Sequence, residues 1–203
     1  VLATFRLQEP RAQSLNLLRD TKYHQLEKEG KSPPEIQDLL HDAGMDRLIA
    51  WLPTAIPDGD ESTIVHGDFR CDNMIFHPTE PKVIAVLDWE LATVGDPLMD
   101  LGYLLNFWNE AGDDPHWHQV SRMPTDHEGF LTRAEVVERY ARRTGADTDR
   151  VAWYHVFGVF KLVVIIQQIY IRFVRGQTHD QRFARYGERV RDLARKGVVL
   201  MDA

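Results

Sequence analysis

Apolar residues recur at intervals of three and four along much of the chain, which predicts amphipathic helices. Leu15, Leu18 and Leu26 indicate one helix within residues 11–29, and the sequence Ser-Pro-Pro-Glu at positions 32–35 is typical of the start of a second. Later helices are predicted in the same way, over residues 97–108, 132–145, 151–174 and 183–193.

The middle of the chain has a different pattern. Short β-branched or apolar runs at residues 63–65, 73–76 and 83–87 predict three short strands with polar residues at their ends. After Asp88 we expect only helices and loops. Because no repeat, low-complexity tract or flexible linker separates these segments, we expect a single α+β domain that covers residues 1–203.

Composition and charge narrow the function classes. The 203 residues are 43% hydrophobic and 27% charged, with a formal net charge of −7, which disfavours a general nucleic-acid partner because phosphate contacts need clustered cations. The single cysteine, Cys71, permits no disulfide within the chain and no cysteine-based zinc cluster. It also favours the cytoplasm as the compartment.

The segment 151–174 is apolar enough to raise the question of a membrane. Lys161 lies near its centre, and the longest uncharged apolar run is well short of the roughly 20 residues that a membrane span needs. We therefore predict a buried core helix and no membrane partner.

Three polar motifs carry the candidate chemistry. They are His-Gly-Asp-Phe-Arg-Cys-Asp-Asn at 66–73, Leu-Asp-Trp-Glu at 87–90 and Gly-Asp-Pro-Leu-Met-Asp at 95–100. Phosphoryl transfer to an alcohol needs a carboxylate near the hydroxyl and oxygen ligands for Mg²⁺. An Asp, an Asn five residues later and an Asp at a following strand end supply these groups, at the Asp-to-Asn interval of the protein-kinase catalytic loop.

These motifs, in this order and spacing, resemble the catalytic core of the aminoglycoside phosphotransferase family, also called the choline-kinase-like family. The string from His66 to Asp100 is most similar to the branch that is fused to acyl-CoA dehydrogenases. The resemblance implies an α+β fold, a protein-kinase-like C-terminal lobe that is mostly helical with a few short strands. It also implies an enzyme that uses ATP and Mg²⁺ to phosphorylate the hydroxyl of a small molecule.

The resemblance also implies roles for individual residues. Asp68 would be the catalytic base, and Asn73 and Asp88 would bind Mg²⁺ and, through it, the nucleotide. Arg70 is expected to stabilise the transferring phosphoryl group. Four residues are expected in supporting roles: His66, Glu90, Asp96 and Asp100.

One part of the family pattern is missing. Nothing before Thr63 resembles the family's N-terminal lobe, because there is neither a Gly-rich loop after a strand nor a Val-Ala-Ile-Lys-like segment. We therefore expect a C-terminal lobe without its ATP-gripping lobe, which alone would bind ATP weakly and have little or no activity. For the acceptor, a hydroxylated acid or its thioester is preferred over an antibiotic, because of the fused relatives.

Other readings of the same residues stay open. Asp68 and Asn73 could be turn formers, Asp88 a strand-end cap, and Arg70 a surface charge. Trp89 is expected to pack in the core, and Cys71 is expected to be a small packing residue and not a nucleophile. Two other functions are weighed: a non-catalytic binding module, and a metal-dependent phosphoesterase, which would need more His and Asp ligands than the motifs offer.

Overall fold

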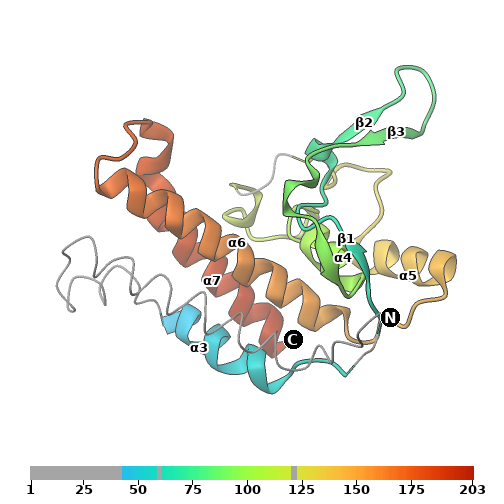
Figure 1. The fold of residues 1–203 in the computed structure, drawn as a ribbon, viewed down its shortest axis with the longest axis horizontal. Helices are drawn as coiled ribbons and strands as arrows, with labels where there is room; N and C mark the ends of the chain where they lie inside the picture. The colour runs from blue at the N-terminus through green and yellow to red at the C-terminus, as the bar shows by residue number, and fades with distance from the viewer. Residues whose placement is uncertain (1–42, 59–60, 120–122) are drawn as a thin grey trace, which may run out of the picture.

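The computed structural model describes residues 43–58, 61–119 and 123–203 (Figure 1). Its helices are α3 (Ala43–Trp51), α4 (Leu98–Leu105), α5 (Arg133–Thr144), α6 (Val151–Val174) and α7 (Tyr186–Asp202). Its strands are β1 (Thr63–Val65), β2 (Met74–Phe76), β3 (Val83–Val86) and β4 (Thr93–Gly95). The helix predicted within 11–29, and nearly all of the one predicted from Ser32, lie outside the described residues.

Helix α6 is the centre of the core. It lies against α4 and α7, and α3 packs on α7 at the other side (Figure 1). Val156, Val159 and Val163 of α6 are completely buried. The helix is long and apolar enough to cross a membrane by length and composition alone, but much of it is buried in this helical layer, as predicted for a core helix.

The close contact between α4 and α6 depends on glycine. A Cβ atom at Gly102 would lie 2.4 Å from the backbone carbonyl carbon of Tyr154, and one at Gly158 would lie 2.5 Å from the side-chain Nδ2 of Asn106 and 3.0 Å from the Cα of Tyr103. Only residues without a Cβ allow the two helices to approach this closely. This contact places the middle and the end of α4 beside the first two turns of α6.

Helix α5 begins and ends where the sequence predicts. The hydroxyl of Thr132 accepts a hydrogen bond from the Glu135 amide at 3.2 Å, and the Glu135 carboxylate accepts one from the Thr132 amide at 2.7 Å. Gly145 ends the helix with a φ of 73°. These contacts form the capping box and the left-handed helix end that the pattern indicated.

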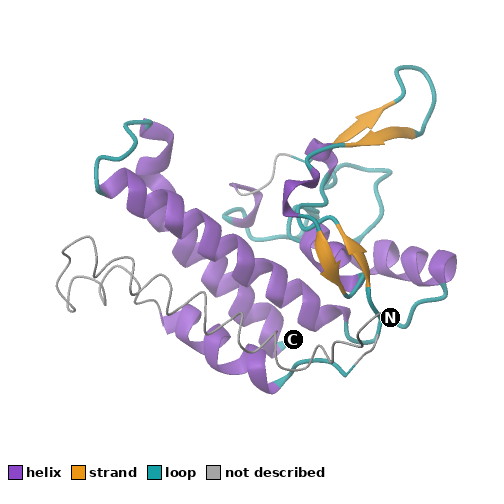
Figure 2. Ribbon diagram, in the orientation of Figure 1, coloured by secondary structure: helices purple, strands orange, loops and turns teal. Residues whose placement is uncertain are grey.

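The strands form two antiparallel pairs, β1 with β4 and β2 with β3, on one side of the long helices (Figure 2). Strand β4 contradicts the expectation that only helices and loops follow Asp88. Its three residues pair Thr93 with Val65, Val94 with Ile64 and Gly95 with Thr63. A strand this short is stabilised by its partner, so its own sequence gives little signal.

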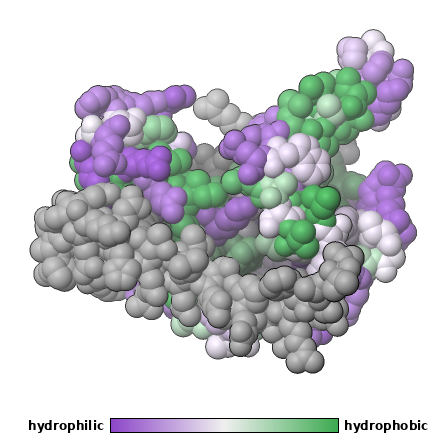
Figure 3. Space-filling model, viewed as in Figure 1, coloured by the Kyte–Doolittle hydropathy of each residue, from purple (hydrophilic) through white to green (hydrophobic). Residues whose placement is uncertain are grey.

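The β2–β3 hairpin exposes apolar side chains. Phe76 and Ile84 are about half exposed, and Figure 3 shows apolar residues gathered over this hairpin. An apolar patch of this kind is typical of a surface that contacts another part of a protein or a ligand.

Candidate active site

The predicted catalytic loop follows β1 and turns sharply at Gly67. This residue has a φ of +81°, which a side chain rarely tolerates, and a Cβ there would lie 2.5 Å from the Leu91 carbonyl oxygen. Glycine therefore lets the chain turn between His66 and Asp68 and pass close to the segment after β3.

The carboxylate of Asp100 holds this turn. It lies in the first turn of α4 and accepts hydrogen bonds from the His66 amide at 2.6 Å and from the Gly67 amide at 2.8 Å. Hydrogen bonds to a charged group are stronger than those between neutral groups. The structure thus places Asp100 as a clamp on the loop, in the supporting position that the sequence suggested.

The buried His66 ring joins the loop to the end of β3. Its Nδ1 accepts a hydrogen bond from the Asp68 amide at 3.2 Å, so its Nε2 carries the proton that it donates to the Leu87 carbonyl at 2.7 Å. Trp89 packs against this ring, with 4.6 Å between the centroids. Trp89 is nevertheless 51% exposed, so the expectation that it belongs to the core is wrong.

Asp68 and Asn73 meet directly. The Asn73 side-chain amide donates hydrogen bonds to the Asp68 backbone oxygen at 2.8 Å and to its carboxylate Oδ2 at 3.0 Å. The Asp68 side chain is 16% exposed, so it is held in place but still accessible. Because Nδ2 of Asn73 faces Asp68, the remaining ligand atom of this side chain is its carbonyl oxygen.

Asp88 is brought near Asn73 by the pairing of the backbone between β2 and β3. The Leu87 amide donates to the Asn73 carbonyl at 2.8 Å, which extends the pairing of β2 with β3 by one step. Asp88 follows in a left-handed conformation, with a φ of 66°, and its side chain is exposed. The backbone therefore brings Asp88 close to Asn73.

The donor set fits Mg²⁺. One carboxylate and one amide oxygen are hard ligands, and Mg²⁺ usually completes its shell with water and phosphate oxygens. In the part of the chain that the structure describes, no three His, Cys, Asp or Glu side chains form a metal site by themselves. A metal at Asn73 and Asp88 would thus depend on oxygens from a bound phosphate or water.

Arg70 lies beside the predicted base. Its Nε is 3.5 Å from Oδ2 of Asp68, its Nη1 is 3.6 Å from Asp72, and its guanidinium lies 5.3 Å from the centre of the Phe107 ring. The structure thus gives Arg70 carboxylate partners, and its contact with a phosphoryl group stays a prediction.

The neighbouring Cys71 thiol does not have the properties of a nucleophile. Burial, followed by the charge of Asp72, raises its pKa, which opposes a nucleophilic role.

Asp96 is set apart from the loop. Its Oδ1 accepts from the Leu98 amide at 2.9 Å, at the start of α4, and its Oδ2 accepts from the Tyr154 hydroxyl at 2.6 Å. The structure places it as a buried link between α4 and α6. Glu90 is exposed after β3.

Two residues near Asp68 were missed by sequence reasoning, Tyr103 and Lys161. Burial, together with the charge of Asp68 and a hydrogen bond to it, raises the pKa of the Tyr103 hydroxyl, so this group stays protonated. The Lys161 ammonium donates to the Gly67 carbonyl and lies 4.8 Å from the centre of the Tyr103 ring. A lone charge within an otherwise apolar helix was the signal that could have identified Lys161.

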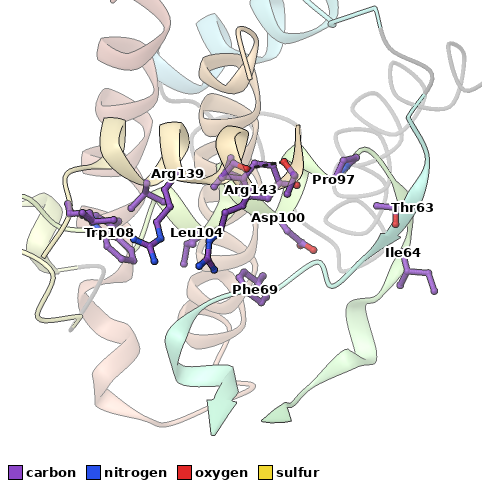
Figure 4. Close-up of a pocket in the computed structure, with 14 residues that line it drawn as sticks. Thr63, Ile64, Phe69, Pro97, Asp100, Leu104, Trp108, Arg139 and Arg143 are labelled. Carbon is purple, nitrogen blue, oxygen red and sulfur yellow. Dashed lines mark hydrogen bonds between the residues drawn. The ribbon is translucent and has the colours of Figure 1, made fainter. Parts of the chain in front are cut away.

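A cavity of about 700 Å³ opens beside the loop, between β1, α4 and α5 (Figure 4). Phe69 and Asp100 line it on the loop side, and Leu104 lies on the α4 wall. Arg139 and Arg143 extend from α5 toward the side where Phe69 lies (Figure 4). The volume suits a small organic molecule, and the lining combines apolar surface with two cations and the carboxylate of Asp100.

The chain is similar in sequence to members of a phosphotransferase family. The model of a family described as "Phosphotransferase enzyme family" matches residues 3–154. Mouse acyl-CoA dehydrogenase family member 11 is 38% identical over 159 residues, which is 77% of this chain and 20% of that protein. A 4-hydroxytryptamine kinase from Psilocybe cubensis is 30% identical over 102 residues, covering 45% of this chain and 26% of that protein.

A solved structure shares the fold. It comes from Ralstonia eutropha JMP134 and is named provisionally as an aminoglycoside phosphotransferase. The TM-score is 0.70 at 34% identity, over 93% of this chain and 54% of that one. The expected kinase-like fold, mostly helical with a few short strands, is confirmed. This chain therefore spans about half of that structure and a much smaller share of the longer relatives.

Proposed function

Because the chain belongs to the phosphotransferase enzyme family, we propose that it forms the catalytic lobe of an ATP- and Mg²⁺-dependent kinase that phosphorylates a small-molecule hydroxyl. The observation that carries this proposal is the contact between Asp68 and Asn73, with Asp88 one residue beyond the backbone pair that joins Asn73 to Leu87. A proton acceptor and two oxygen ligands are thereby gathered around one loop, as phosphoryl transfer requires.

Each residue then has one task. Asp68 accepts the proton of the acceptor hydroxyl, and the amide of Asn73 keeps its carboxylate oriented. Asn73 and Asp88 would hold Mg²⁺, which when bound neutralises charge on the phosphate oxygens. His66 and Asp100 fix the loop from two directions, so that the base does not have to be ordered during the reaction.

We place the acceptor in the cavity beside the loop. Its apolar wall at Leu104 and Trp108 suits a hydrocarbon portion, and Phe69, the residue after Asp68, is part of the lining. Arg139 and Arg143 favour an acceptor with a negative charge over a cationic one. A hydroxylated carboxylic acid satisfies both conditions, and its thioester does so when the thiol portion carries the negative charge.

The test uses the full-length protein with Mg²⁺, γ-³²P-labelled ATP and a panel of hydroxy acids, with choline and kanamycin as cationic acceptors. We expect transfer to a hydroxy acid, and the variant Asp68→Asn should lower its rate by about 10²–10⁴-fold. The control Asp147→Asn changes an exposed carboxylate between α5 and α6 and should leave the rate unchanged.

An Asp68→Asn variant that transfers phosphate at the wild-type rate would contradict the proposal. Binding of Mg²⁺ and ATP without transfer to any acceptor would favour the non-catalytic binding module instead.

A further inference from the structure

Lys161 is a cation in the middle of the apolar helix α6. The residues around it in the helix, including Phe160 and Leu162, are buried in the core. Burial lowers the pKa of Lys161, and the charges of Asp68 and Asp100 oppose this shift. Keeping a half-buried ammonium group at this position is unfavourable unless polar partners compensate for its lost hydration.

The partner of this ammonium group is the catalytic loop itself. Lys161 Nζ donates a hydrogen bond to the carbonyl of Gly67. This carbonyl belongs to the peptide bond between Gly67 and Asp68. The amide of Gly67 is held at the same time by Asp100, at 2.8 Å. Both polar groups of Gly67 are therefore bound to charged side chains, one from α4 and one from α6.

The surroundings of Nζ favour this one arrangement. The face of the Tyr103 ring lies 4.8 Å away, which is within the range of a cation–π interaction. Asp68 and Asp100 supply the negative charges that face the ammonium group. The hydrogen bond fixes the plane of the Gly67–Asp68 peptide, whose N–H is bound to His66.

We propose that Lys161 is a positioning residue for phosphoryl transfer, which holds the Gly67 carbonyl and so fixes the orientation of Asp68. The proposal rests on the proposed function, because it assigns to Asp68 the role of the base. Lys161 acts through the peptide backbone of the loop. Its loss should therefore affect turnover much more than nucleotide affinity.

The first test compares Lys161→Met and Lys161→Arg with the wild type in the full-length protein. Lys161→Met keeps an unbranched side chain that is one atom shorter and has no charge. It should lower kcat by about 10–100-fold, with less than about a threefold change in KM for ATP, because misplacement of a catalytic group acts on the chemical step. Lys161→Arg keeps a cationic donor and should recover most of kcat. The matched control Arg172→Met removes an exposed cation from the same helix and should leave both constants unchanged.

The second test does not depend on activity. Loss of a charge-assisted hydrogen bond should speed hydrogen–deuterium exchange in peptides that span residues 65–70 by about tenfold or more in Lys161→Met, and not in Arg172→Met. Should Lys161→Met fail to fold, Lys161→Gln, which has only a neutral N–H donor, replaces it with the same expected direction.

The outcomes separate the two proposals. If Asp68→Asn abolishes transfer but Lys161→Met has wild-type kcat and wild-type exchange, the inference on Lys161 is wrong and the proposed function stands. If Asp68→Asn has no effect, the proposed function is wrong, and the exchange measurement alone decides whether Lys161 holds the loop.

Discussion

Replacing Asp100 with alanine removes a side chain that binds two consecutive amides of the catalytic loop. Both bonds are short, 2.6 Å to His66 and 2.8 Å to Gly67, and both acceptor atoms belong to one carboxylate. In Asp100→Ala both amides lose this acceptor.

The expected loss in the free energy of unfolding follows from these two hydrogen bonds. A hydrogen bond to a charged group contributes about 1.5–3 kcal/mol, and water that enters this half-buried site recovers part of the loss. We therefore expect Asp100→Ala to lower the free energy of unfolding by about 2–4 kcal/mol. Asp100→Asn keeps one carbonyl acceptor but turns an N–H₂ group toward the second amide, so we expect roughly half of the loss or more.

Urea unfolding of the 203-residue chain, followed by tryptophan fluorescence, measures this change as a shift in midpoint at constant slope. Glu138→Ala is the control, since this exposed residue forms an exposed 3.6 Å ion pair with Arg142 and should change stability by less than about 0.5 kcal/mol. If Asp100→Ala lowers the free energy of unfolding by less than about 0.5 kcal/mol, Asp100 does not hold the loop in the way inferred from its two hydrogen bonds.

Three further predictions concern stability. Gly67→Ala should cost about 2 kcal/mol or more in urea unfolding, because of its φ of +81° and the contact with Leu91; a variant as stable as wild type would show that the loop can relax. Tyr154→Phe removes the hydroxyl at 2.6 Å from the buried Asp96 and should cost about 2 kcal/mol; an unchanged midpoint would contradict this link. Burial, followed by the charges of Lys196 and Arg133, lowers the pKa of His155 to about 3, below its value in the unfolded chain. The neutral His155 therefore contributes fully to the free energy of unfolding above about pH 6.5, and this contribution is lost as the pH falls. Between pH 7.5 and 5.5 the wild type should lose about 1.4 kcal/mol more than His155→Leu, and parallel pH profiles would contradict this.

Much of the fold could be predicted from the sequence. Helices α4 to α7 follow from apolar spacing and from local start and stop signals, since these patterns act within a few residues. The prediction that 97–108 is helical was too long, because α4 ends at Leu105. Phe183 lies in the short 3-10 helix before α7, so the last predicted helix began too early and ended too soon.

The candidate site was predictable where the motif is local and unpredictable where it depends on packing. Asp68 and Asn73 lie five residues apart on one loop, so their contact follows from their spacing. Lys161 reaches Gly67 from 94 residues away, and only the packing of α6 shows this. The partly exposed Trp89 was placed in the core because apolar character alone does not say which face of a strand end is covered.

We propose that Asn73 and Asp88 hold a divalent cation next to Asp68. Crystals of the full-length protein grown with Mn²⁺ and a non-hydrolysable ATP analogue test it through the anomalous signal of the metal. We expect a peak within metal–oxygen bonding distance, about 2.0–2.6 Å, of the Asn73 side-chain oxygen and the Asp88 carboxylate. A bound nucleotide whose metal contacts neither side chain would contradict it.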